Sequence, residues 1–70
     1  GPDGLRFHRA LVAQAPAFLR PGGGLILEIG WDQGTAVAEL LRRDARYASS
    51  GIARDLAGRD RVAWGVTVHR

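Results

Sequence analysis

The segment from Glu28 to Gly34 holds the residues whose types and spacing could do chemistry. It reads Glu-Ile-Gly-Trp-Asp-Gln-Gly and directly follows an apolar run at residues 25–27. Glycines at a turn let the backbone come close to a ligand, and a strand that ends in such a turn before a helix opens the ligand-binding edge of an open α/β sheet. We therefore expect Glu28–Gly34 to face whatever this protein acts on.

The same segment resembles the first cofactor motif of S-adenosylmethionine-dependent methyltransferases, in which a strand ends in Glu-x-Gly-x-Gly-x-Gly. Two features depart from that motif: Asp32 stands in place of the central glycine, and the bulky Trp31 precedes it. An acidic residue for the ribose should follow about 20 residues later, at the end of a second strand. The best candidate, Asp55, comes later and lies in an expected hairpin. These departures weigh against a cofactor loop in this segment.

The other chemically able side chains do not form a recognisable site. His8 and His69 are isolated, with no carboxylate or Cys partner at ligand spacing, which argues for helix-face or surface residues and against a metal site. Glu28 and Asp32 flank one turn but make no acid–base pair without a substrate pose. The remaining charged cluster is expected to hold a hairpin turn by local pairing: Asp55, Arg59, Asp60 and Arg61. We assign no catalytic, cofactor-binding or metal-ligating residue.

A helix is expected before the Glu28–Gly34 segment, beginning near Leu5 with Asp3 as its N-cap. Its apolar stripe recurs at three- and four-residue steps: Phe7, Leu11, Val12, Ala15, Phe18 and Leu19. Pro16 should kink this helix or begin a second short turn, because proline has no amide proton. Pro21–Gly23 then ends the helix and turns the chain.

Within residues 24–29, the run Leu25-Ile26-Leu27 with Ile29 shows no alternation, which predicts a strand buried on both faces of a parallel sheet. A second helix is expected over about residues 33–43, with Asp32 or Thr35 as its cap. Its buried stripe and its solvent-exposed face separate at helical spacing: Ala36, Val37, Leu40 and Leu41 against Glu39, Arg42 and Arg43.

Two strands joined by a turn are expected after the second helix. The polar residues 44–50 are predicted to be a loop, residues 51–56 a strand, and residues 57–60 the turn. Residues 61–69 alternate between two faces: Val62, Trp64, Val66 and Val68 on one, and Ala63, Gly65 and Thr67 on the other. We expect Trp64 in the core, and Trp31 either lining the mouth of the site or packing under a loop.

Composition limits the classes of function. The 70 residues suffice for one small domain or part of a larger one, and the absence of cysteine excludes disulfides and thiolate metal sites. The formal charge is +3, and all ten cationic residues are arginines spread along the chain, which favours a solvated surface over a nucleic-acid patch. No apolar stretch reaches the ~18 residues of a membrane span. The sequence predicts a soluble cytoplasmic protein without a membrane, metal or nucleic-acid partner.

Two segments in the first half of the chain resemble the peptide chain release factor N(5)-glutamine methyltransferase family. Asp3–Arg9 is similar to that family's Asp-Gly-Leu-x-Phe-Tyr-Arg, with His8 where the family usually has Tyr. Leu19–Gly23, followed by Leu27–Gly30 and Gln33, looks like the family's next segment.

A third segment carries the most specific part of this resemblance. Asp55–Val62 reads Asp-Leu-Ala-Gly-Arg-Asp-Arg-Val and, with Gly65 after it, is similar to the family's carboxyl-terminal signature. The stretch 44–52 departs from the pattern, because it lacks the usual Gly-Phe approach to the next strand. The three segments occur in the family's order and together cover nearly the whole chain.

The resemblance implies a fold class, which is α/β. Residues 1–70 would be the carboxyl-terminal segment of a Rossmann-like class I methyltransferase domain, in the order helix, strand, helix, antiparallel hairpin. Residues 24–29 would be the fifth of seven strands and the hairpin the sixth and seventh, with the sixth parallel to the fifth and the seventh antiparallel to both. The turn at residues 57–60 would then share the sheet edge of Gly30 and Trp31. The family's glycine-rich cofactor loop and its Asn-Pro-Pro-Tyr motif match nothing in this chain.

The resemblance also implies a function. The parent would be an S-adenosylmethionine-dependent enzyme that methylates the side-chain amide of a glutamine in translation release factors, and this piece alone would be inactive. One alternative is the same part of another class I methyltransferase, acting on nucleic acid or a small molecule. A second alternative is a free-standing basic binding module.

Overall fold

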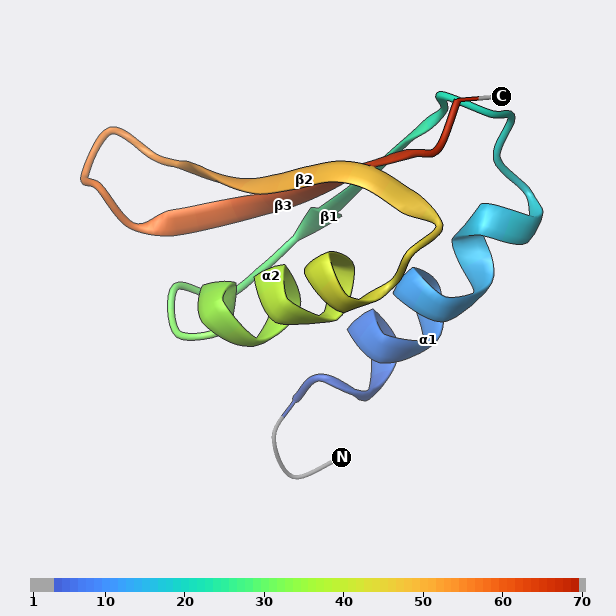
Figure 1. Ribbon diagram of the computed structural model, residues 1–70. Coiled ribbons are helices and arrows are strands. Elements are labelled where there is room, and N and C mark those ends of the chain that lie inside the picture. Colours follow the sequence, from blue (N-terminus) through green and yellow to red (C-terminus); the bar gives the residue numbers. More distant parts are fainter. Residues whose placement is uncertain (1–3, 70) are drawn as a thin grey trace.

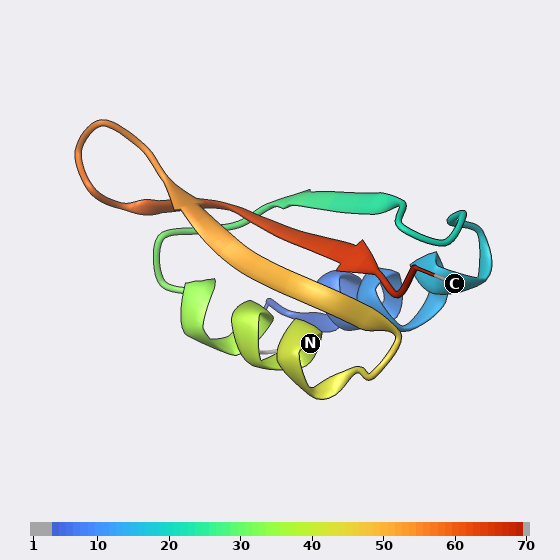
Figure 2. The same ribbon diagram turned by 45° about the horizontal axis from the view of Figure 1, so that its top comes forward.

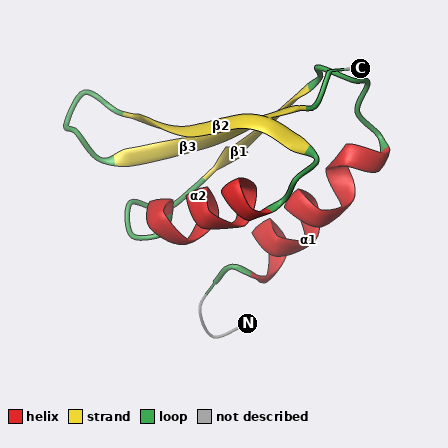
Figure 3. Ribbon diagram, viewed as in Figure 1, coloured by secondary structure: helices red, strands yellow, loops and turns green. Residues whose placement is uncertain are grey.

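The computed structural model describes residues 4–69 of the chain. Helices and strands alternate along it as the sequence predicts, and a short 3₁₀ helix extends the first helix (Figure 1, Figure 3). The elements are α1 (Arg6–Gln14), η1 (Ala15–Ala17), β1 (Gly24–Glu28), α2 (Gly34–Arg43), β2 (Tyr47–Arg54) and β3 (Asp60–Thr67). The expected α/β class is confirmed.

The three strands form one sheet in the order β1-β3-β2, so the last strand in sequence is the middle one. β3 pairs antiparallel with β1, with Ile26 opposite Trp64, and antiparallel with β2, with Gly51 opposite the same Trp64. Two strands that are both antiparallel to a third must be parallel to each other. The expected directions of all three strands are therefore confirmed.

Both α-helices lie on the same side of the sheet (Figure 1, Figure 2). The buried apolar residues gather between the helices and the sheet: Leu5, Val12, Leu27, Ile29, Val37, Leu41, Tyr47 and Ala63. Val37 and Leu41 of α2 have the largest side chains that are fully buried, and burial of a side chain of this size contributes about 1.5–3 kcal/mol. The stripe predicted for the second helix is confirmed.

The prediction that residues 24–29 are buried on both faces is wrong. Leu27 is buried against the helices, whereas the side chain of Ile26, on the opposite face, is 74% exposed. β1 pairs with β3 alone among the described residues, which makes it an edge strand. An apolar run indicates that both faces of a strand can be buried. It does not indicate that residues 4–69 themselves cover both faces.

The alternation predicted for the last strand is confirmed, but its buried face is the opposite of the one expected. Ala63 and Thr67 are buried beneath the helices, while Trp64 is half-buried on the far face of the sheet. The Trp64 ring lies over Gly51 of β2, where an added Cβ would come within 2.7 Å of it. The small residues face the helices because the helices approach the sheet closely there.

The first helix is shorter than predicted. η1 begins at Ala15 beside Pro16, as expected for a second short turn. Two members of the predicted apolar stripe point to solvent: the side chains of Phe7 and Phe18 are 69% and 87% exposed. The helix begins after Leu5 without a side-chain cap, and the expected cap, Asp3, lies outside the described residues.

The predicted loop over residues 44–50 is wrong in its second half, because β2 begins at Tyr47. The Tyr47 hydroxyl donates a buried hydrogen bond of 2.8 Å to the carbonyl oxygen of Val12 in α1, and burial raises the pKa of this phenol. Arg46 donates to the carbonyl oxygen of Ala13 at 2.9 Å. Both carbonyls belong to the last turn of α1, where carbonyl groups find no N–H donor inside the helix.

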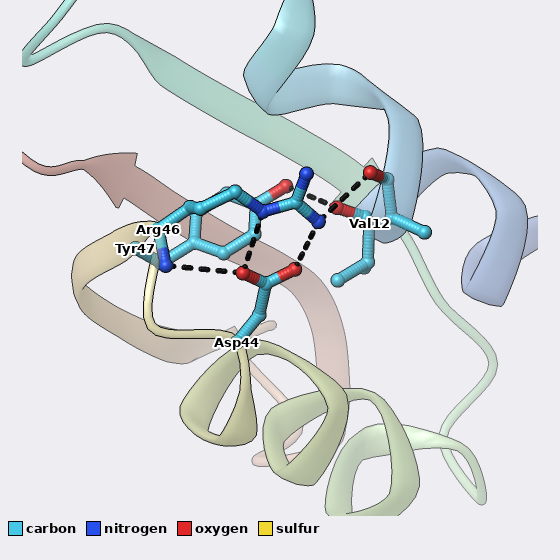
Figure 4. A network of polar contacts seen from close by, with 5 residues as sticks. Val12, Asp44, Arg46 and Tyr47 are labelled. Atoms are coloured by element: carbon cyan, nitrogen blue, oxygen red, sulfur yellow. Dashed lines mark hydrogen bonds and ion pairs between the residues drawn. The ribbon is translucent and has the colours of Figure 1, made fainter.

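Asp44 holds this Arg46 in place (Figure 4). Its two carboxylate oxygens accept from the guanidinium at 2.6 and 2.9 Å. The hydrogen bonds from Arg46 lower the pKa of the Asp44 carboxyl. The start of β2 is therefore fixed by contacts with a helix more than thirty residues earlier in the chain.

The expected caps of the second helix are not used. α2 begins at Gly34, after Gln33, and no side chain of the preceding residue caps its first turn. The side chain of Gln33 bonds backward along the chain instead, into the turn that forms the candidate site.

Candidate functional site at the carboxyl edge of the sheet

Two turns meet at one edge of the sheet. β1 ends with Glu28 opposite Val62, and β2 ends with Arg54 opposite Asp60. The turn after β1 and the turn between β2 and β3 therefore lie at the same end of the molecule (Figure 1, Figure 2). The expectation that residues 57–60 share an edge with Gly30 and Trp31 is confirmed.

The first turn, residues 30–33, is closed by the side chain of Gln33; we call it the Gln33 turn. The backbone N–H of Gln33 donates to the Gly30 carbonyl at 2.9 Å. In the opposite direction, the Gly30 N–H donates to Oε1 of Gln33 at 2.8 Å. The other end of the same amide donates to the Gly4 carbonyl at 3.2 Å. One side chain thus fixes the turn and ties it to the segment before α1.

His8 adds a second tie between α1 and the end of β1. Its Nε2 lies 2.9 Å from the Glu28 carbonyl oxygen and donates to it in the matching tautomer. Its Nδ1 is buried and has no hydrogen-bond partner. His8 lies on α1 and is half-buried, which agrees with the predicted helix-face residue, and its ring also reaches across to the sheet.

The geometry of the Gln33 turn does not fit a cofactor loop. In such a loop the backbone N–H groups face the ligand, but here the Gly30 N–H is taken by Gln33. Asp32 adds a negative charge at the exposed side of the turn.

The second turn, residues 55–59, is built around Asp55; we call it the Asp55 turn. Oδ1 of Asp55 accepts from the N–H groups of Ala57 and Arg59 at 2.9 and 3.0 Å. Arg59 also pairs with the carboxylate at 3.6 Å. The N–H of Arg59 is the main cause that lowers the pKa of Asp55. Local pairing within the turn is confirmed for Asp55 and Arg59.

Asp60 and Arg61 do not join that pairing in the expected way. Asp60 forms an ion pair of 3.0 Å with Arg54, across the base of the hairpin. Its carboxylate also lies directly over Gly34, where an added Cβ would collide with it. Arg61 bonds through its backbone, accepting from the N–H of Ile29 at 3.0 Å. Asp60 therefore joins the hairpin to the start of α2.

A shallow pocket of about 300 Å³ opens beside Asp60. Its walls are the exposed side of α2, from Gly34 to Arg42, and the hairpin residues Ile52 and Arg54. Charged side chains that are paired within the protein surround it. Such a pocket can shape a binding surface, but its charged side chains already form ion pairs with one another.

Each of the two turns presents one large apolar side chain to solvent. The Trp31 side chain is 71% exposed, and that of Leu56 is fully exposed. Of the two alternatives for Trp31, packing under a loop is therefore excluded by the structure of residues 4–69, and the side chain lies at the mouth. Leu56 was expected to carry a strand, but it lies in the turn after β2.

Sequence reasoning missed the roles of Gln33 and Tyr47. The spacing of Gly30 and Gln33 is a usable signal. In a capping box, a Glu or Gln side chain likewise accepts from the backbone N–H three residues earlier. Nothing local announces the bond from Tyr47, whose partner is 35 positions away.

No group of three His, Cys, Asp or Glu side chains that could hold a metal ion occurs in residues 4–69. In the same range, no helix is long and apolar enough to cross a membrane.

Known proteins similar to this chain include release factor glutamine methyltransferases from several bacteria. That of Xylella fastidiosa (strain Temecula1) is 54% identical over 65 residues, which is 93% of this chain and 23% of that protein. Those of Moorella thermoacetica and Cereibacter sphaeroides are 52% and 53% identical over 87% and 89% of this chain, and over 22% of each relative. No protein-family model and no solved structure matches. The chain thus spans less than a quarter of the length of these curated relatives, and the resemblance predicted from its motifs is confirmed.

Proposed function

We propose that this chain, similar over about nine-tenths of its length to release factor glutamine methyltransferases, forms the carboxyl-terminal segment of such an enzyme. The parent would transfer a methyl group from S-adenosylmethionine to the side-chain amide of a glutamine in a release factor. The cofactor-binding half would lie outside these residues. The observation that carries this proposal is the identity of 51–54% to relatives of that name.

The sheet supports the same proposal. In the topology implied by the resemblance, the antiparallel seventh strand lies beside strands that are parallel to each other. β3 takes that place between β1 and β2. The free edge of β1 is where the further parallel strands of that topology would add.

We infer a role for this chain in the reaction from the position of its two turns. S-adenosylmethionine supplies the methyl group when it is bound to the parent. An amide nitrogen is a poor nucleophile, so catalysis depends mainly on holding it in position and excluding water. The two fixed turns at the carboxyl edge would form part of the wall against which the substrate is held. The chain alone would be inactive, because its own turn does not fit the cofactor.

A chimera tests this proposal. The matching 65-residue segment of the Xylella fastidiosa (strain Temecula1) enzyme is replaced by the corresponding residues of this chain. We expect the chimera to fold, bind S-adenosylmethionine and add one methyl group to the target glutamine of a release factor, detected by peptide mass spectrometry. The same enzyme with the segment deleted is the control and should not turn over.

Three results would contradict the proposal. A chimera that fails to fold would show that this chain cannot replace the segment it resembles. A chimera that folds and binds cofactor but leaves the release factor unmodified would contradict the substrate assignment. Methylation of RNA, DNA or a small amide in place of the protein would favour another class I methyltransferase.

A further inference from the structure

Trp31 and Leu56 are exposed on turns that are themselves fixed. The Gln33 turn is closed by a backbone hydrogen bond and by both ends of the Gln33 amide. The Asp55 turn is closed by two N–H groups on one carboxylate oxygen and by the bond from the Gly58 N–H to the Asp55 carbonyl at 2.9 Å. A side chain on a fixed turn loses little backbone freedom when it is buried by a partner.

The location of these two side chains is the second observation. Single exposed apolar residues are common on protein surfaces, but these two occupy the two turns of one edge (Figure 1, Figure 2). That edge is where open α/β sheets receive their ligands. Exposed Phe18, by contrast, follows η1 at the opposite edge, where β3 ends.

The charge at this edge selects the kind of partner. Residues 29–33 and 54–61 carry three arginines against three aspartates. Arg54 pairs with Asp60 and Arg59 pairs with Asp55. Binding of a nucleic-acid backbone requires several unpaired cations, and these residues offer only Arg61, although the chain as a whole is basic. An aromatic and an aliphatic anchor on a nearly neutral edge suit a polypeptide.

We propose that Trp31 and Leu56 are two apolar anchors for the protein substrate. They contact the polypeptide segment that carries the target glutamine. This inference rests on the proposed function and assigns it a substrate-binding surface. Trp31 is the stronger anchor, because tryptophan is the side chain most enriched among residues that dominate binding energy. The chemistry of the partner is an apolar loop without a requirement for strong charge.

Kinetics of the chimera test the assignment. Trp31→Ala should raise the KM for the release factor about tenfold, and Leu56→Ala should raise it several-fold. The affinity for S-adenosylmethionine and the melting temperature should stay unchanged. Trp31→Phe should recover most of the loss, because it restores an aromatic anchor. Phe18→Ala is the matched control: it removes an equally exposed aromatic at the other edge, and its KM should stay within about twofold of the parent.

A spectroscopic measurement separates substrate docking from other roles of Trp31. The chimera is labelled with 5-fluorotryptophan, and the Trp31 resonance is assigned with Trp31→Phe. We expect a solvent-accessible Trp31 signal in the free enzyme that shifts when release factor is added. An RNA oligomer at the same concentration should leave it in place.

The outcomes that overturn this inference differ from those that overturn the proposed function. An active chimera in which both alanine variants keep the parental KM would refute the anchors alone. So would a Trp31 signal that is shielded from solvent before substrate is added, since that would place the rest of the enzyme on it. A shift caused by RNA, or one that depends only on protein concentration, would assign the surface to nucleic acid or to a second copy of the chain.

Discussion

Single side chains connect segments of this small structure that are distant in the sequence, each through a hydrogen bond. Gln33 contacts Gly4, His8 contacts Glu28, and Tyr47 contacts Val12. In each pair a side chain bonds to a backbone carbonyl. The bond from Tyr47 is buried, and a buried carbonyl without a partner is costly, so removal of that hydroxyl loses the bond and leaves the Val12 carbonyl unsatisfied.

Gln33→Leu should therefore reduce the free energy of unfolding of the chimera by about 1–2 kcal/mol, because it removes two hydrogen bonds at once. Urea unfolding measures the change. Gln14→Leu is the control, since Gln14 is an exposed residue at the end of α1, and its effect should be within about 0.5 kcal/mol. Equal effects for the two variants would show that the Gln33 amide does not stabilise the turn.

Gly34 and Asp60 should be coupled. Gly34→Ala places a Cβ where the Asp60 carboxylate lies, and crowding of this kind costs about 1–3 kcal/mol. In an Asp60→Ala background the same change should cost less, since the carboxylate is gone and only the Cβ of residue 60, 3.1 Å away, remains close, while alanine favours the helix. A double-mutant cycle by urea unfolding gives the coupling. The same cost in both backgrounds would contradict the close approach.

At the scale of elements, prediction from the sequence succeeded where the pattern was local. Val37 and Leu41 follow a helical period, and Ala63 and Thr67 follow a strand period, so α2 and β3 could be located. The start of β2 could not, because Ala48, Ser49 and Ser50 carry no strand pattern, and Tyr47, through its contact with α1, fixes the beginning of the strand.

The candidate site shows the same division. A strand followed by a Gly-bounded turn and a helix was enough to identify the carboxyl edge. The choice of partner for Asp60 was not predictable, because Arg59 and Arg61 are nearer in sequence than Arg54 and only the hairpin register brings Arg54 opposite.

The turn between β2 and β3 depends on Gly58. Its φ is +81°, and nothing lies within 4 Å of the position of an added Cβ. Gly58→Val should destabilise the chimera by about 1–2 kcal/mol through backbone strain alone. Gly58→Asn should cost less, because asparagine tolerates positive φ. Thermal melting measures both, and equal losses for the two substitutions would point to a steric cause instead.

The connection from α2 to β2 should respond to acid. The pKa of Asp44 is lowered in the folded state by Arg46, so this pair stabilises the fold above the ordinary carboxyl pKa of about 4. The contribution is lost as the pH falls through the lower folded pKa. Asp44→Asn should remove this part of the acid dependence, and Arg46→Leu should remove the same part. Urea unfolding between neutral pH and about pH 3 measures it; an unchanged slope in both variants would contradict the pair's role.

At the scale of the whole molecule, the described residues cover only one face of the sheet. The other face carries Ile26, Val62, Trp64 and Val66, which the strand register places side by side. β1 also has a free edge. An apolar face and a free edge together favour association between chains.

Residues 1–70 expressed alone should therefore be marginally stable or self-associated. Sedimentation at increasing concentration should show oligomers, and Ile26→Lys should reduce them. Phe18→Lys is the control, because Phe18 is exposed at the end of η1 and belongs to no strand of the sheet, and it should leave association unchanged. A monomer that melts cooperatively above ~65 °C, the top of the usual mesophile range, would contradict the proposal that these residues are one part of a larger domain.

The position of β3 in the middle of the sheet has a consequence for synthesis. β1 ends at Glu28 and β3 begins at Asp60, so the ribosome must add about thirty residues before β1 can pair with β3. At roughly 5–20 residues per second this takes a few seconds. Throughout that interval the apolar run of β1 lacks this partner, which makes it a candidate binding segment for a chaperone on the nascent chain.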